Sequence, residues 1–128
     1  MIMTQEDKEL LLKDLCARLP YGVILNVTLK DKYDEIVNRD IEMFDNNLTY
    51  MISDSHWKTY KPYLRPMSSM TKEEKEEYQY ITERWMYNAD YSIADSIDWL
   101  NAHHFDYRGL IEKGLAIAIT ENNNPYKK

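Results

Sequence analysis

The chain has 128 residues, of which 44% are hydrophobic and 30% charged, and its formal net charge is −6. This length suits one domain with a single core, and the composition excludes collagen-like, coiled-coil and low-complexity chains. A single cysteine excludes an internal disulfide, and no apolar run approaches the roughly 20 residues that span a bilayer. The N-terminal residues are too polar for a secretory signal. We therefore expect a cytoplasmic protein without membrane contact, bound metal or cofactor.

The net charge is concentrated in one segment. Residues 73–98 contain eight acidic and two basic residues and thus carry the whole net charge of −6, while the rest of the chain is neutral. Residues 55–72, directly before them, contain four basic residues and no acidic one. Charge segregation of this kind favours a macromolecular partner.

The first predicted element is a helix that ends before Pro20. Thr4 is expected to cap it, with Asp7 three residues further on. Its apolar residues recur with the 3.6-residue period of an amphipathic helix, at Leu11, Leu12, Leu15, Cys16 and Leu19. Cys16 is accordingly expected to be a small apolar residue on the buried face and not a nucleophilic thiol.

The periodicity then changes from 3.6 to 2, which predicts strands. In residues 22–29, GVILNVTL, the odd-numbered positions are apolar and predict a strand with one buried face. Two further strands are expected within residues 35–44 and 48–53, joined by the turn residues DNN. Together these segments predict a three-stranded antiparallel meander.

Residues 57–67 are predicted to form an ordered loop, because Pro62 and Pro66 argue against a regular helix or a central strand. Rings alternate with basic side chains there, a pattern used in contacts with phosphate or single-stranded nucleic acid. The structural alternative is that the rings fix the loop to the sheet, and four positive charges in an acidic chain make a weak nucleic-acid footprint. The candidate binding residues are Trp57, Lys58, Tyr60, Lys61, Tyr63 and Arg65.

A second helix is predicted to begin after Thr71, where TKEE forms a capping box with Glu74. Its outer face is a negative band, which is usually solvated surface. The functional alternative is a docking face for a basic protein partner, or a mimic of the nucleic-acid backbone. Its apolar stripe is Tyr78, Ile81, Trp85 and Ala89, and the candidate contact residues are Glu73, Glu76 and Glu77.

A third helix, capped by Ser92, is predicted to lead into DWLNAHHFDYRGL at residues 98–110, a dense group of chemically capable side chains. His104 continues the buried stripe of this helix, while His103 stacks one turn above Trp99 on the adjacent face. The two imidazoles therefore diverge and do not chelate one metal ion. A histidine oriented by Asp106, with Arg108 nearby, would suit a small hydrolase or a nucleotide-processing enzyme.

The structural interpretation of the same string explains more of its residues. Asp106 can cap the following turn, Phe105 and Tyr107 can pack under that turn, and Arg108 can pair with an acid of the negative band. The sequence contains no GxSxG, P-loop, HExxH or glycine-rich dinucleotide motif to complete an active site. We therefore expect a helix-to-turn junction here.

Two strings, KPYLRPMSSMT at residues 61–71 and DWLNAHHFDYRGLIEKGLAI at residues 98–117, resemble a family of small proteins encoded by gut Bacteroidetes-type bacteria and by their phages and mobile elements. They cover about a quarter of the chain. The resemblance implies an intracellular protein of phage or mobile-element origin. The family has no established activity, so the resemblance assigns no role to any residue.

The expected fold is α+β, with an N-terminal helix, a three-stranded antiparallel meander, two further helices packed on one face and a short C-terminal strand, GLAIAIT. We expect one domain over residues 1–120 and a polar tail over residues 121–128. The expected function is binding to a protein partner without catalysis. The alternatives are a small enzyme using His103, His104, Asp106 and Arg108, and a weak nucleic-acid binder using residues 57–67. A homodimer through an open strand edge is a further option.

Overall fold

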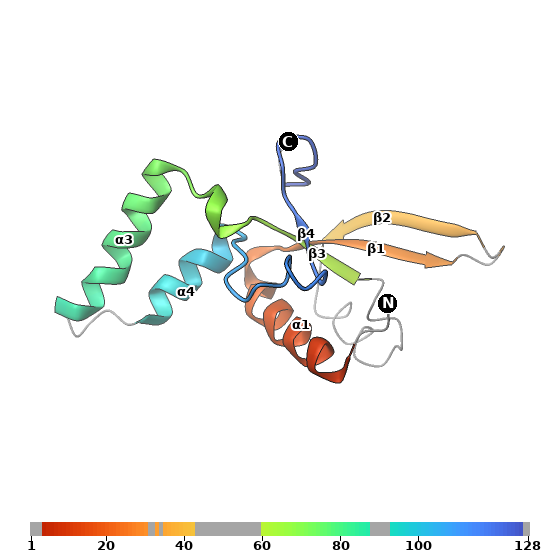
Figure 1. Ribbon diagram of the computed structural model, residues 1–128, viewed down its shortest axis with the longest axis horizontal. Coiled ribbons are helices and arrows are strands. Elements are labelled where there is room, and N and C mark those ends of the chain that lie inside the picture. The colour runs from red at the N-terminus through yellow and green to blue at the C-terminus, as the bar shows by residue number, and fades with distance from the viewer. Residues whose placement is uncertain (1–3, 31–32, 34, 43–59, 88–92, 127–128) are drawn as a thin grey trace.

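The computed structural model describes residues 4–30, 33, 35–42, 60–87 and 93–126. The fold is α+β, as predicted, and the molecule is elongated, with helices α3 and α4 at one end and a ribbon of β1 and β2 at the other (Figure 1). Within the described residues no helix is long and apolar enough to cross a membrane. The elements are α1 (Gln5–Arg18), β1 (Ile24–Lys30), β2 (Ile36–Glu42), β3 (Tyr60–Leu64), α3 (Lys72–Tyr87), α4 (Ile93–Ala102) and β4 (Ile117–Ala118).

Helix α1 begins and ends where the sequence predicts. Thr4 and Asp7 form the capping box, in which the Asp7 amide donates to Thr4 Oγ1 at 3.0 Å. The prediction that Cys16 lies on the buried face was wrong, because this residue is exposed. The buried positions of the helix are Leu11, Asp14, Leu15 and Arg18, so the buried face includes a charged pair that is not part of the predicted apolar stripe.

Strands β1 and β2 form the predicted antiparallel hairpin. Val23, Leu25 and Val27 are buried against α1, which confirms the predicted apolar face. The ladder pairs Leu25 with Ile41 and runs the full length of both strands. The outer half of the ribbon extends beyond β3, because β1 pairs with β3 only over residues 25–27.

The rest of the sheet differs from the predicted meander. The strand order is β2-β1-β3-β4, and β3 lies in the segment expected to be a loop. Pro62 lies opposite Leu25 in a central strand, and its missing N–H is outweighed by the burial of Tyr60, Tyr63 and Leu64 in the same five residues. Strand β4 joins the sheet as expected but runs parallel to β3, so the sheet is mixed. The strand expected at residues 48–53, the turn DNN and Ser92 lie outside the described residues.

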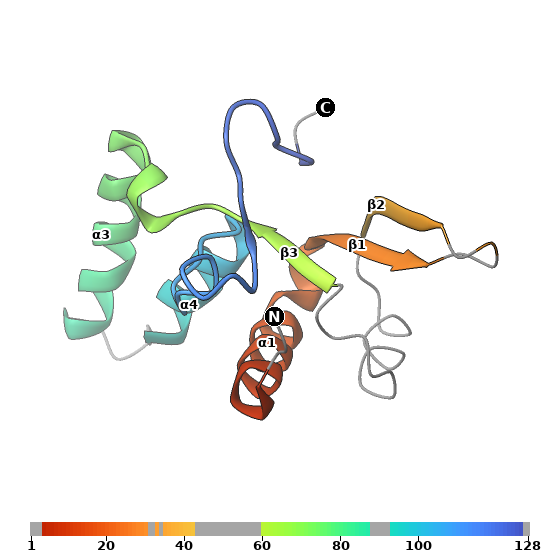
Figure 2. The same cartoon turned by 45° about the vertical axis from the view of Figure 1, so that its right-hand side comes forward.

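Helices α3 and α4 pack on each other beside a second apolar cluster. Its buried members are Met70, Trp99, Leu100 and Phe105, and Tyr78 and Ile81 of the predicted α3 stripe pack against them. The side chain of Trp85 and residue Ala89 lie outside the described part of the chain. Figure 2 shows that α4 lies between α3 and the sheet, so α3 has one face turned away from the molecule.

Candidate functional site

His103 packs against Trp99 of the second apolar cluster, as its spacing from Trp99 predicts. Its ring stacks on the Trp99 indole with centroids 4.1 Å apart, and its Nδ1 lies 2.8 Å from the Trp99 carbonyl oxygen. A carbonyl only accepts, so this hydrogen bond requires the proton on Nδ1. The ring stack continues from Trp99 to Tyr78 and Phe105.

We had expected His104 to continue the buried stripe of α4. It lies instead in the turn that ends the helix. The His104 amide bonds the Asn101 carbonyl and the Phe105 amide bonds the Leu100 carbonyl, which together form a Schellman motif. His104 occupies the left-handed position of this motif, with φ 62°, where glycine is usual. The expected helix-to-turn junction is thereby confirmed.

The ring of His104 lies against Tyr126, with centroids 3.8 Å apart. Burial, followed by the positive charge of Arg18, lowers the pKa of His104 to about 4. The ring is therefore neutral at neutral pH. The two histidines face different partners, since His103 contacts Trp99 and His104 contacts Tyr126.

Asp106 caps the next turn, as predicted. Its Oδ1 accepts from the Leu110 amide and its Oδ2 from the Ile111 amide, each at 2.9 Å, and the side chain is nearly buried. Both carboxylate oxygens are thus engaged by backbone donors. Among the hydrogen bonds of the described residues, none joins Asp106 to His103 or His104.

Arg108 pairs with an acid, but not with one of the negative band as we had expected. It lies 3.0 Å from Asp14 of α1, which is also bound by Arg18 at 2.7 Å. Asp14 and Arg18 are both 0% exposed, and Arg18 also donates from Nη2 to the Phe105 carbonyl. Asp14 is bound by both Arg18 and Arg108. Two guanidinium groups on one carboxylate reduce the free-energy cost of burying its charge.

Tyr107 and Asn101 extend this network to α4. Arg108 donates to the Tyr107 hydroxyl at 2.9 Å, and that hydroxyl donates to Asn101 Oδ1 at 2.9 Å. The Arg108 guanidinium also lies over the Tyr107 ring, 4.7 Å from its centroid. The network therefore holds α1, α4 and the turn that carries Asp106 together.

The candidate residues of the loop prediction fall into separate settings. Trp57 and Lys58 lie outside the described residues, Tyr60 and Tyr63 are buried in β3, and Lys61 is half-buried. The Tyr63 hydroxyl donates to Asp40 on β2 at 2.9 Å. The two rings therefore contribute to the sheet, as the structural alternative proposed.

Arg65 connects the end of β3 to the start of α3. Its Nη1 and Nη2 each lie 2.7 Å from a carboxylate oxygen of Glu74, and its guanidinium lies over the Phe105 ring at 4.2 Å from the centroid. Glu74 also accepts from the Thr71 amide at 2.9 Å, which confirms the capping box. These hydrogen bonds, those from Arg65 first, lower the pKa of Glu74 to about 2.

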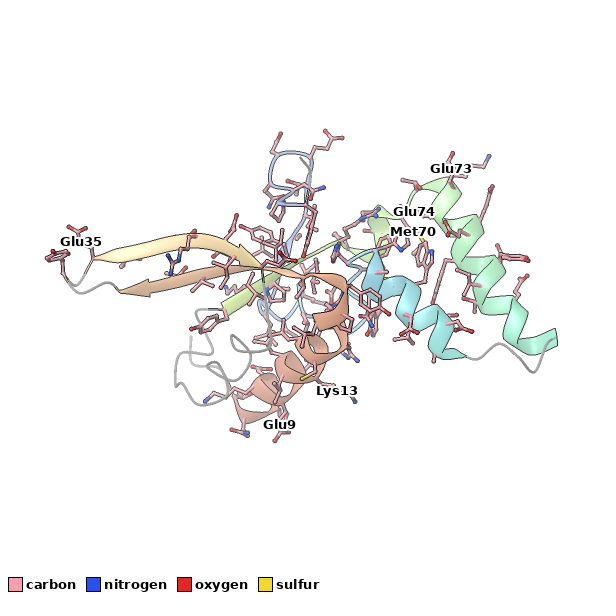
Figure 3. The ribbon with its side chains drawn as sticks, turned by 180° about the vertical axis from the view of Figure 1, so that it is seen from behind. Glu9, Lys13, Glu35, Met70, Glu73 and Glu74 are labelled. Carbon is pink, nitrogen blue, oxygen red and sulfur yellow. The ribbon has the colours of Figure 1, made fainter. Side chains whose placement is uncertain are left out.

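The remaining candidates lie on the outer face of α3. Glu73 is exposed in the first turn of α3, whereas Glu74 in the same turn lies closer to Met70 and the body of the molecule (Figure 3). Tyr80 is 60% exposed on the same helix. Helical spacing places Tyr80 among exposed acids three and four residues away, namely Glu76, Glu77 and Glu83.

No protein-family model matches the chain, and no curated protein and no solved structure was found to be similar to it. The class of the protein is therefore given by its own structure: an α+β protein in which a mixed sheet carries a helical pair at one end. Within the described residues, no group of three or more His, Cys, Asp or Glu side chains is placed to hold a metal ion.

Two features of the site were missed in the sequence. Asp14 and Arg18 stand four residues apart beside Leu11 and Leu15, so the spacing of a helical ion pair was a usable signal. Tyr126 gives no such signal, because its partners are far away in the chain.

Proposed function

We propose that the protein is a cytoplasmic, non-enzymatic binding protein whose outer α3 face docks a basic segment of a protein partner. The observation that carries the proposal is the exposed group of Glu73, Glu76, Glu77 and Glu83 around the exposed Tyr80, on a helix at one end of the molecule. Acidic side chains steer a basic partner, and a tyrosine adds apolar contact area with a polar tip. An origin in a phage or mobile element, as the resemblance implies, is part of this proposal.

Binding is favoured over catalysis by what the chemically capable side chains contact. His103 packs on Trp99, Asp106 binds two backbone amides, and Arg108 binds Asp14. Each interaction supports the local fold, and together they direct the side chains to different partners. The His–Asp hydrolase considered from the sequence would require a histidine and its orienting carboxylate within hydrogen-bonding reach of each other.

The test begins with capture of the tagged protein from its source cells with and without nuclease, followed by titration of the purified partner. The variant Glu73→Lys/Glu76→Lys/Glu77→Lys is expected to weaken association roughly tenfold or more at low salt, with a smaller effect at high salt. The matched control is Lys72→Glu/Lys75→Glu on the same helix, which is expected to leave association unchanged or stronger. Equal affinities for wild type and the triple variant would contradict the proposal, as would retention that nuclease abolishes.

A further inference from the structure

Tyr126 inserts its hydroxyl between β1 and β3. The phenol oxygen accepts a hydrogen bond from the Ile24 amide at 2.8 Å and donates one to the Tyr63 carbonyl at 3.1 Å. Since Leu25 lies opposite Pro62, the next rung of this antiparallel ladder would join Ile24 and Tyr63. The hydroxyl therefore takes the place of a backbone hydrogen bond. Burial raises the pKa of Tyr126 to about 12, so the hydroxyl keeps the proton that it donates.

The ring of Tyr126 is held by His104. Their planes are only 12° apart, with centroids 3.8 Å apart. The left-handed position of His104 costs a residue with a side chain about 1 kcal/mol, which glycine would avoid. A histidine at this position gives Tyr126 a flat partner that glycine would not provide.

The segment that carries Tyr126 is attached to the body at its two ends. The Ile119 amide donates to the Leu64 carbonyl at 2.8 Å, next to the β3–β4 ladder. The hydrogen bonds described for residues 120–124 stay within residues 118–126, and residues 121–123 are exposed. The segment loops away from the sheet on the side opposite α1 (Figures 1 and 2). Tyr126 therefore holds its far end.

We propose that the Ile24 amide, the Tyr63 carbonyl and the His104 ring form a phenol-binding socket, and that residues 120–126 are a releasable strap whose Tyr126 fills it. The three groups define the ligand class. A phenol supplies a ring for the imidazole and a hydroxyl that both accepts from an amide and donates to a carbonyl. A plain aromatic ring would leave the two backbone groups unpaired, and a buried unpaired group costs about 1–3 kcal/mol.

Release of the strap would open the socket to a tyrosine from a protein partner. The Ile24 donor and the Tyr63 acceptor would then be free at neighbouring strand ends, beside the His104 ring. The strap and the partner would compete for the same three groups, so the strap acts as a built-in competitor. This socket is separate from the acidic face of α3, and its test does not depend on the partner proposed for that face.

The experiment measures amide hydrogen exchange by NMR in the full-length protein and in its Tyr126→Phe and Tyr126→Ala variants. Protection of the Ile24 amide is expected to fall roughly tenfold or more in both variants, because its acceptor is removed. The Val27 amide is the internal reference, since β1 lies between β2 and β3 there, and its protection is expected to change less than about twofold. The control Tyr80→Phe, on the exposed face of α3, is expected to leave both amides unchanged.

Chemical rescue tests the ligand class. p-Cresol is expected to restore Ile24 protection in Tyr126→Ala, whereas toluene, which has the same ring and methyl group but no hydroxyl, is expected not to. His104→Gly is expected to lower Ile24 protection without lowering the free energy of unfolding, because the glycine removes the backbone strain together with the stack.

Three results would overturn the proposal. Unchanged Ile24 protection in Tyr126→Phe would show that the hydroxyl does not close the ladder. Equal loss of protection at Ile24 and Val27 would show that Tyr126 belongs to the cooperative core and is not a strap. Equal rescue by toluene and p-cresol would remove the phenol specificity. Tyr126→Phe keeps the ring and supplies the first two results even where Tyr126→Ala does not fold.

Discussion

Asp14 and Arg18, one turn apart on α1 and both without solvent exposure, form a salt bridge of 2.7 Å at the junction of α1, α4 and the turn that follows α4. A charged pair is costly to bury, and here the cost is reduced because Arg108 and the Phe105 carbonyl also bind the pair. The two residues therefore tie the first helix to residues near the other end of the chain.

Removing the carboxylate of Asp14 should leave Arg18 charged and buried without its partner. We expect Asp14→Asn to lower the free energy of unfolding by about 3–5 kcal/mol, as measured by urea denaturation. The loss should be especially large because Arg18 Nη1 has no hydrogen-bond partner among the described residues even in the wild type. The control is Lys13→Ala, an exposed position on the same helix, with an expected change within about 0.5 kcal/mol.

The double variant Asp14→Leu/Arg18→Met should be less destabilised than Asp14→Asn, because apolar side chains of similar volume carry no charge into the interior. A change below about 1 kcal/mol for Asp14→Asn would show that the pair is not buried as described.

The features that could be predicted from the sequence are those set by neighbouring residues. The capping boxes at Thr4 and Thr71 and the cap at Asp106 depend on residues three to five positions away, and the structure confirms all three. The stacking of His103 on Trp99 follows from one helical turn. These interactions join residues that are at most five positions apart, so tertiary packing was not needed to find them.

The features that the sequence did not reveal depend on distant partners. Pro62 by itself argues against a central strand. Its neighbours are buried between β1 and β4, and this burial favours the strand that the structure contains. Cys16 shares the apolar period of α1, but the helix buries Asp14 and Arg18 beside its leucines, and Cys16 lies on the exposed side. Tyr126 meets Ile24 across most of the chain, and no local pattern indicates such a contact.

The exposure of Cys16 can be measured directly. We expect the Cys16 thiol to react with a disulfide reagent such as DTNB in the folded protein. Its rate should be within about tenfold of the rate in urea, because the reagent reaches an exposed thiol without unfolding of the chain. A thiol that reacts only after unfolding would restore the sequence prediction that Cys16 is buried.

The Arg65–Glu74 pair should make stability depend on pH below the ordinary range of glutamate. The folded pKa of Glu74 is about 2, against 4.5 as its ordinary value, so the stabilisation is complete above pH 4.5 and is lost as the pH falls to about 2. The stabilisation from the pair is below about 3 kcal/mol, because Arg65 and Glu74 are 23% and 18% exposed and solvent screens their interaction. Thermal unfolding of Glu74→Gln should show a smaller pH dependence in this window than Glu73→Gln, its exposed neighbour. Identical profiles for the two variants would argue against the pair.

His104 should add a second pH dependence in a higher window. Its folded pKa is about 4, against an ordinary value of 6.5, so the unfolded chain binds the proton first as the pH falls. Stability is therefore highest above pH 6.5 and decreases as the pH falls to about 4, by well below about 3 kcal/mol because solvent reaches part of the ring and screens it. In His104→Asn, which accepts the left-handed backbone without a titrating ring, this decrease should disappear, while the decrease below pH 4.5 from Glu74 should remain. Chemical denaturation at closely spaced pH values separates the two windows. A slope between pH 6.5 and 4 that is equal in wild type and His104→Asn would assign the titration to other groups.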